Sequence, residues 1–327
     1  MSSILNNSAA LSALQALQMT QQSLATVQNQ VSTGLSVASA ADNSSYWSIS
    51  AQLNQDNGIV TASNTALTEG QSVMSTATSA INSVITTLNS MATALTQAQN
   101  PGANLIAINT SLVSLGSQLT DAVSNASFNG ENILNGSITT TIPKGAGTTP
   151  GVSFVSGYQA TDIGGTVQTI NMATQSLYTT GTAGGAATDL LIQTVAAAAV
   201  PTADATNTNI GNPLDLTNFT AGTTTAAPGT ITSAADSAVY LAAVNQALTA
   251  VTNYSATIGA TQDRMTAAST FNTALSTNYS NGVAGLVDAN MNTASTQLQA
   301  LQTQEQLGIQ SLSIANQNAQ LILKLFG

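Results

Sequence analysis

The sequence predicts a mainly α protein with a β-rich insertion in the middle of the chain. Apolar residues recur with heptad spacing over long stretches at both ends, which is typical of long helices that pack along a narrow seam. Five of the six prolines lie instead between Pro143 and Pro228, in a segment rich in Thr, Gly and Ala. Helices do not tolerate that density of breakers, so this segment is expected to form strands and turns.

The stretch from Gly58 to Gln99 predicts a long helix, because its apolar residues fall in two rows of sevenfold spacing. The first row is Leu67, Met74, Ile81, Leu88 and Leu95, and the second is Gly70, Ala77, Val84, Met91 and Ala98. The sequence "NPGAN" at 100–104 ends this helix. A second seam from Leu105 to Ala122 then predicts a shorter helix that returns antiparallel to the first. The sequence "FNGENILNGS" at 128–137 ends this helical part with two Asn-Gly dipeptides, each of which predicts a turn.

The C-terminal part repeats this pattern. A seam that includes Val244, Ile258 and Met265 predicts another long helix, and "SNG" at 280–282 is expected to separate it from a final helix. The seam of the final helix is predicted at Leu298, Leu301, Leu312, Ile322 and Phe326, with Glu305 and Gly308 interrupting it. A matching stripe near the start of the chain consists of Leu11, Leu14, Leu17, Leu24, Val27 and Val31.

These elements predict a nested layout in which the first long helix pairs with the last, and further helices lie between them. The expected divisions are 1–45, 46–136, 137–233, 234–283 and 284–327. Within 137–233, runs such as "GVSFVSGY" and "GTVQTINMATQSLY" favour a small β-rich domain. The alternative for this segment is a disordered, Thr-rich insert.

Charge and composition exclude several classes of protein. Only 5% of the 327 residues are charged, the net charge is −10, and Lys144, Arg264 and Lys324 are the three basic residues. Nucleic acid and anionic membranes need basic clusters, and no run of eighteen apolar residues predicts a membrane span. The chain has no His and no Cys, so we expect no catalytic site, no metal site and no cofactor.

The predicted helices have few charged residues at the positions outside their apolar seams. Their remaining positions are mostly Asn, Gln, Ser and Thr, which provide few ion pairs and little repulsion between molecules. The apolar rhythm also continues to Phe326, where chain ends are usually polar. Two helices alone bury one seam, so we expect both ends to fold only when they assemble with other copies.

Four motifs in a fixed order resemble bacterial flagellins. They are "QVSTGLSVASAADNSSYWSIS" at 30–50, "NASFNGENILNG" at 125–136, "IGATQDRM" at 258–265 and "SLSIANQNAQLILKLFG" at 311–327. The resemblance covers about 140 residues at the front and about 90 at the back. The middle of the chain resembles no family in particular, as is usual for the variable domain of a flagellin.

The resemblance implies a subunit of the extracellular flagellar filament. Residues 1–45 and 284–327 would form an inner coiled-coil layer, residues 46–136 and 234–283 an outer layer, and residues 137–233 a variable surface domain. It further implies type III export and contacts with a filament cap, hook-junction proteins and an export chaperone. The alternatives are a hook–filament junction protein and a secreted adhesin or effector that does not polymerise.

Several positions depart from the flagellin pattern. Ser36 and Ala41 stand where the family has basic residues, and Tyr46 and Trp47 replace small ones. We therefore expect subunit contacts that depend little on salt. Trp47 is interpreted as an interface anchor or a packed residue, and Arg264 as an outer-layer residue that forms an ion pair or hydrogen bonds, the alternative being a solvated position.

A further departure concerns the surface that a vertebrate immune receptor recognises on many flagellins. In those proteins the corresponding helix carries an Arg, whereas this chain has Ser90, Met91 and Ala94 there and no Arg before Arg264. The resemblance therefore predicts that the receptor does not recognise this chain.

Overall fold

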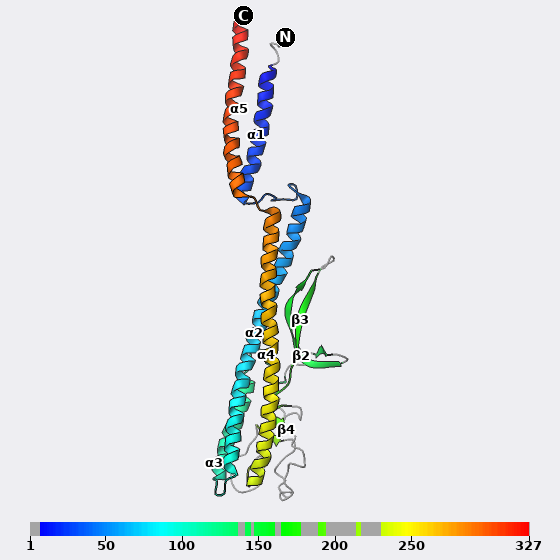
Figure 1. Cartoon of the computed structure of the whole chain (residues 1–327), viewed down its shortest axis with the longest axis vertical. Coiled ribbons are helices and arrows are strands. Elements are labelled where there is room, and N and C mark those ends of the chain that lie inside the picture. The colour runs from blue at the N-terminus through cyan, green and yellow to red at the C-terminus, as the bar shows by residue number, and fades with distance from the viewer. Residues whose placement is uncertain are drawn as a thin grey trace. The chain divides into compact units, whose positions relative to one another are not determined.

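Five helices make up most of the described chain, as the sequence predicts (Figure 1). They are α1 (Ser8–Thr33), α2 (Ser44–Ala98), α3 (Leu105–Ser124), α4 (Ala234–Val287) and α5 (Met291–Phe326). The computed structural model describes residues 7–136, 141–144, 147–160, 165–177, 189–193, 214–216 and 230–326. Most of the segment 137–233 therefore lies outside the described residues.

The helix boundaries follow local capping chemistry. The Asn7 side chain accepts a hydrogen bond from Ala10 N at the start of α1, and Gly34 ends that helix in the left-handed conformation with φ of 75°. At the start of α4, the Asp236 carboxylate accepts hydrogen bonds from Thr232 and Ser233, and Ser233 Oγ accepts one from Asp236 N. This reciprocal arrangement is a capping box, which satisfies the free N–H groups of the first turn.

One predicted boundary is wrong. Helix α4 continues through "SNG" to Val287, and the break lies at 288–290. A single glycine inside a helix costs only about 1 kcal/mol, so Gly282 is tolerated while α4 packs beside α2. Asn290 supplies the actual start signal of α5, because its side chain accepts hydrogen bonds from Asn292 N and Thr293 N.

The strands confirm a β-rich insertion. An antiparallel sheet has the order β1 (Thr141–Lys144), β2 (Gly147–Gln159), β3 (Thr166–Ala173), and β4 (Ile192–Gln193) pairs with β5 (Leu214–Asp215). The β2–β3 register shifts between Val155 and Gly157, which is the mark of a bulge.

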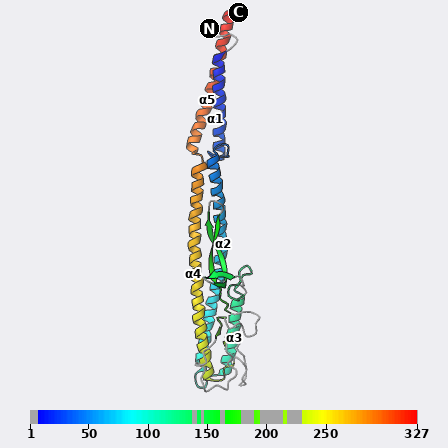
Figure 2. The same cartoon turned by 90° about the vertical axis from the view of Figure 1, so that its right-hand side faces the viewer.

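The chain divides into two compact units. The central unit comprises Val60–Thr273, and the terminal unit comprises Met1–Ile59 with Ala274–Gly327. Within the central unit, α2, α3 and α4 lie along one another and the β2–β3 hairpin covers part of them (Figures 1 and 2). Within the terminal unit, α1 and α5 run side by side and antiparallel (Figures 1 and 2).

The core of the molecule belongs to the central unit. Both predicted rows of α2 are buried there from Leu67 to Ala98, together with Val244, Ile258 and Met265 of α4. Gly70 lies where the hairpin approaches α2, because a Cβ at this position would be 2.6 Å from Met265 Cε and from Phe154 Cδ1. The heptad rows therefore pack against helices on one side and against the sheet on another.

Candidate assembly surface

Contacts spread along α1 and α5 fix the register of this terminal pair. Asn7 Nδ2 donates a hydrogen bond of 3.1 Å to Ala315 O, and Gln21 Nε2 donates one of 3.4 Å to Glu305 Oε1. Between these two, Leu17 packs on Gly308, where an added Cβ would be 3.2 Å from Leu17 Cδ1. The predicted interruptions at Glu305 and Gly308 are thus part of the contact: one binds a glutamine and the other makes room for a leucine.

The predicted seam agrees with the α1–α5 contact only in part. Seam positions with half-buried side chains are Leu17, Leu24, Val31, Leu298, Leu301 and Leu312. Leu11 and Leu14 are exposed instead, at 61% and 41%, because the less exposed face of α1 runs through Ala10 and Ala13. The side chains of Ile322 and Phe326 lie outside the described residues.

The exposed leucines of α1 belong to a larger set of apolar side chains on the terminal unit that face away from its contacts. The large hydrophobic residues exposed on this unit are Leu11, Leu14, Met19, Tyr46, Trp47, Ile49, Met291, Leu307, Ile309 and Ile314. On the central unit they are Ile106, Phe128, Val167 and Phe271. Isolated exposed apolar residues are ordinary, but a concentration on one unit marks an interaction surface.

Sequence reasoning missed part of this set, namely Met19, Ile49, Met291, Leu307, Ile309 and Ile314. A signal was available, because "LGIQSLSIAN" at 307–316 has more large apolar residues than one seam at heptad spacing accommodates. The excess predicts a second apolar stripe on the same helix.

Short hydrogen-bonded segments hold the start of α2 and the two helix breaks of the terminal unit. Ser36 N donates to Val287 O at 2.7 Å, and Ala289 N donates to Gly34 O at 2.8 Å. In the loop before α2, the Asp42 carboxylate accepts hydrogen bonds from Ser39 N, Ser39 Oγ and Ala38 N. These bonds, with that from Ser39 N first, lower the pKa of Asp42.

The central unit brings together nearly all of the predicted outer-layer packing residues. Leu67, Met74, Ile81, Leu88, Leu95, Ile258 and Met265 are all buried. Arg264 is the exception: its residue is exposed, and within the described part of the chain it forms no ion pair. Of the two interpretations of Arg264, the solvated helix position fits the structure.

One of the predicted immune-surface residues also differs from expectation. Met91 is buried in the core of the central unit, whereas Ser90 is exposed and Ala94 is half-buried. Met91 occupies the second heptad row, so its side chain points toward the core and not toward solvent.

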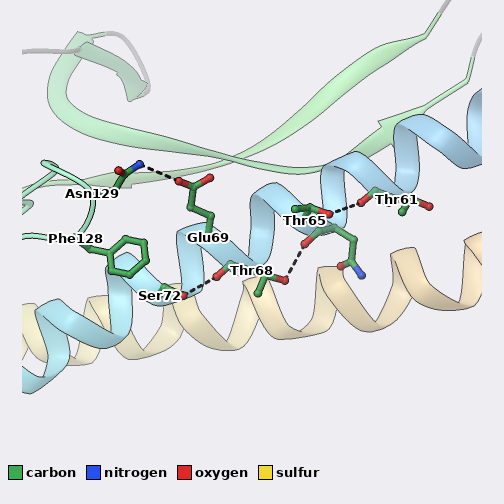
Figure 3. A pocket seen from close by; sticks show the side chains of 8 residues that line it. Thr61, Thr65, Thr68, Glu69, Ser72, Phe128 and Asn129 are labelled. Atoms are coloured by element: carbon green, nitrogen blue, oxygen red, sulfur yellow. Dashed lines mark hydrogen bonds between the residues drawn. The ribbon is translucent and has the colours of Figure 1, made fainter.

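A shallow groove runs along α2 in the central unit (Figure 3). Thr65, Thr68 and Ser72 line it, but each hydroxyl donates to the carbonyl four residues earlier in its own helix. The carboxylate of Glu69 accepts a hydrogen bond of 3.3 Å from Asn129 Nδ2. These hydroxyls and the Glu69 carboxylate therefore already have hydrogen-bond partners within the chain. Such a groove is suited to packing against another surface.

The Asn129 contact comes from one of the predicted Asn-Gly turns. Phe128 and Glu131 exchange two backbone hydrogen bonds of 2.9 Å, and Asn129 and Gly130 between them have φ of 51° and 84°. Positive φ at both central residues defines the tight hairpin turn that Asn-Gly favours. The prediction of a turn at "FNG" is therefore confirmed.

A tyrosine anchors the insertion to the helices of the central unit. Tyr254 of α4 is buried and donates a hydrogen bond of 3.3 Å from its hydroxyl to Ile133 O. Burial raises the pKa of Tyr254 to about 12, while a backbone hydrogen bond involving Gln175 opposes that shift. Tyr254 therefore ties α4 to the segment that follows α3 and to the insertion.

Comparison with known proteins places the chain among filament subunits. Residues 4–139 match the bacterial flagellin N-terminal helical region, and residues 241–326 match the C-terminal helical region. Flagellin C of Rhizobium meliloti (strain 1021) is 36% identical over 296 residues, which cover 89% of this chain and 88% of that protein.

Shorter matches agree with these. A flagellin of Brucella melitensis biotype 1 is 38% identical over 140 residues, covering 42% of this chain and 50% of the relative. Flagellin D of Rhizobium meliloti (strain 1021) is 35% identical over 144 residues, covering 44% and 36%. Among the helices described, none has a stretch apolar and long enough to span a bilayer.

These matches favour neither a junction protein nor a secreted adhesin, and flagellins are structural proteins, not enzymes. The chain belongs to the bacterial flagellin family, whose members polymerise into the flagellar filament.

Proposed function

We propose that copies of this chain join mainly through the terminal unit when the filament forms. The observation that carries this proposal is the contrast between its many exposed apolar side chains and its few buried ones. Within the described part of the terminal unit, the buried hydrophobic residues are Val27, Val287 and Ala294. A unit with so little core of its own gains stability when other copies cover its apolar stripes.

The proposal assigns a layer to each part of the chain. Residues 1–45 and 288–327 form an inner layer, residues 46–136 and 234–287 an outer layer, and residues 137–233 the variable surface, with the last boundary of the sequence prediction moved from 283 to the observed end of α4 at Val287. Support comes from the helix breaks at 34–43 and 288–290, which separate α1 and α5 from the longer helices. In this proposal α1 and α5 become rigid on assembly, because neighbouring copies then bury Leu11, Leu14 and Ile314.

Polymerisation of purified variants tests the proposal. Replacing both Leu14 and Ile314 with Ser removes two exposed apolar groups of the terminal unit, and we expect it to abolish filaments under conditions where the unmodified chain forms them. The matched control is Val167→Ser, which removes an exposed apolar group of the β3 strand in the central unit. Filaments of normal length and yield from the double variant, seen by electron microscopy, would contradict the proposal.

The resemblance supports further partners and a location. The filament cap, hook-junction proteins and an export chaperone are the proposed partners besides identical copies, and the chain is proposed to leave the cell through type III export. Its homologues form the extracellular filament of the flagellum. Pull-down of the chain with these flagellar components, compared between the unmodified chain and a variant lacking α5, tests these partners.

The proposed contacts depend little on ionic strength. Only three basic residues are present in the sequence, and Arg264 is a solvated position in the structure. Ion pairs between copies are therefore scarce, and salt screens only charges. Filament mass measured by sedimentation is expected to stay constant as NaCl rises at neutral pH, and sharp disassembly would contradict this expectation.

The chain is also proposed to escape the vertebrate receptor that senses many flagellins. Support comes from the exposed face around Ser90, which is uncharged and includes half-buried Ala94 but not Met91. Monomer is expected to give no more than background activation of reporter cells that carry the receptor. Strong activation at concentrations where a recognised flagellin saturates the response would end this proposal.

A further inference from the structure

We propose that Tyr46 and Trp47, in the first turn of α2, form an aromatic anchor that packs against a second copy of the chain in the filament. This inference rests on the proposed role of the terminal unit in assembly. Tyr46 is 47% exposed and Trp47 is 43% exposed, so roughly half of each large side chain has no cover within its own chain. Ile49 is 47% exposed and lies three residues after Tyr46, on the same helix face.

The backbone under the two rings is held in place. Asn43 Oδ1 accepts hydrogen bonds from Ser45 N and Tyr46 N, both 3.1 Å long, and Trp47 N donates to Asn43 O at 2.9 Å. One turn later, the hydroxyl of Ser50 donates to Trp47 O at 2.9 Å. A rigid helix start presents the rings without a further entropic cost of ordering the backbone when a partner binds.

Each of the two aromatic residues also has a polar group that can form a hydrogen bond with another molecule. Within the described residues, neither the indole N–H of Trp47 nor the hydroxyl of Tyr46 makes a hydrogen bond to the protein. Tyrosine and tryptophan are enriched among the residues that contribute most to protein interfaces, where their polar groups usually find a hydrogen-bond partner once the ring is buried. The alternative from the sequence, a residue packed inside its own chain, does not fit this exposure.

A second copy is the occupant that the structure favours. The anchor belongs to the same unit as the exposed apolar residues of α1 and α5, and flagellins polymerise with copies of themselves. No Asp, Glu, Lys or Arg lies between Asp42 and Asp56, so this stretch of α2 carries no charge at neutral pH that would repel another copy of a chain whose net charge is −10.

The chain carries its own probe for this contact, because Trp47 is its one tryptophan. We expect the Trp47 emission to shift to shorter wavelength on polymerisation, and quenching by acrylamide to fall several-fold. Emission and quenching that are the same in monomer and filament would overturn the anchor while leaving the filament function intact. A chain that forms no filament would overturn the proposed function and the anchor with it.

A variant series separates burial by another copy from rearrangement within one chain. Trp47→Ala is expected to raise the critical concentration for polymerisation at least tenfold, which corresponds to about 1.4 kcal/mol per tenfold step. Trp47→Phe keeps most of the apolar surface and is expected to restore most of the loss. Far-UV circular dichroism of the monomers should be unchanged in both variants, and a critical concentration unchanged in Trp47→Ala would contradict the inference.

Discussion

The two units of this flagellin use the same heptad pattern with opposite results. In the central unit the pattern closes on itself: α2, α3, α4 and the β2–β3 hairpin share one core, and Leu67, Leu88 and Leu119 are fully buried. In the terminal unit, α5 is the one described helix that runs beside α1, and seam residues such as Leu17, Leu24 and Leu312 remain half-buried. A heptad pattern therefore specifies a helix and a contact face, but the number of neighbouring elements decides whether that face becomes a core.

The hydroxyl-rich surface is common to both units and explains why neither needs charge. Along α2 the side chains of Thr86, Thr87 and Ser90 each donate to the carbonyl four residues earlier. A hydroxyl bonded in this way loses less on burial than a free one, because its donor keeps its partner. Such helix surfaces remain compatible with water in the monomer and with packing in a filament.

The largest expected effect is the difference in lost stability when one leucine of each unit is replaced by alanine. Leu88→Ala is expected to destabilise the central unit by about 2–5 kcal/mol, because it leaves a cavity in a fully buried core. Leu14→Ala in α1 should change monomer stability by less than about 0.5 kcal/mol, since its side chain is already exposed. Urea unfolding of the two monomers measures both effects, and equal losses would contradict the contrast between the units.

Alkaline pH should weaken the central unit through Tyr254. Its folded-state pKa of about 12 lies above the ordinary value of 10, so the unfolded chain loses this proton first and stability falls as pH rises from 10 to 12. The full loss is about 3 kcal/mol, from roughly 1.4 kcal/mol for each pKa unit. Tyr254→Phe lacks the ionisable group, so its unfolding free energy should fall less over this pH range; parallel curves for the two proteins would refute the assignment.

Two glycine substitutions have the smallest expected effects and test the packing of the hairpin on α2. Gly70→Ala should cost about 1–3 kcal/mol, because the added methyl meets Met265 and Phe154 where the hairpin lies on α2. The control is Gly259→Ala in α4, where nothing lies within 4 Å and the better helix former should stabilise by up to about 1 kcal/mol. Thermal unfolding of both variants reports the sign, and a stabilised Gly70→Ala protein would show that the hairpin does not pack there.

Much of the fold follows from the sequence because long periodic segments carry a strong signal. Both rows of α2 were predictable from heptad spacing, and the turn at Asn129 and Gly130 from its dipeptide. The sequence "SNG" predicts a break at Gly282 that the structure does not have, because packing against a neighbouring helix overrides a local helix-breaking signal. Local propensity is a small energy compared with tertiary packing.

The assembly surface was less predictable from sequence than the core. The spacing of Leu11 and Leu14 predicts that they belong to the seam, but apolar spacing does not show which of two stripes faces the intramolecular partner, and both residues are exposed. Arg264 was expected to have a partner, yet spacing carries no information about charges on other elements. The exposure of each side chain on the folded unit shows that these residues lie outside the intramolecular contacts.

The dependence of the terminal unit on other copies is tested most directly by hydrogen exchange on dissociated chains and on filaments. We predict that the amides of α1 and α5 exchange rapidly in the dissociated chain and become strongly protected in the filament, while buried α2 and α4 segments of the central unit are protected in both. Protection of α1 and α5 in the dissociated chain equal to that of the α2 segment around Leu88 would contradict the account.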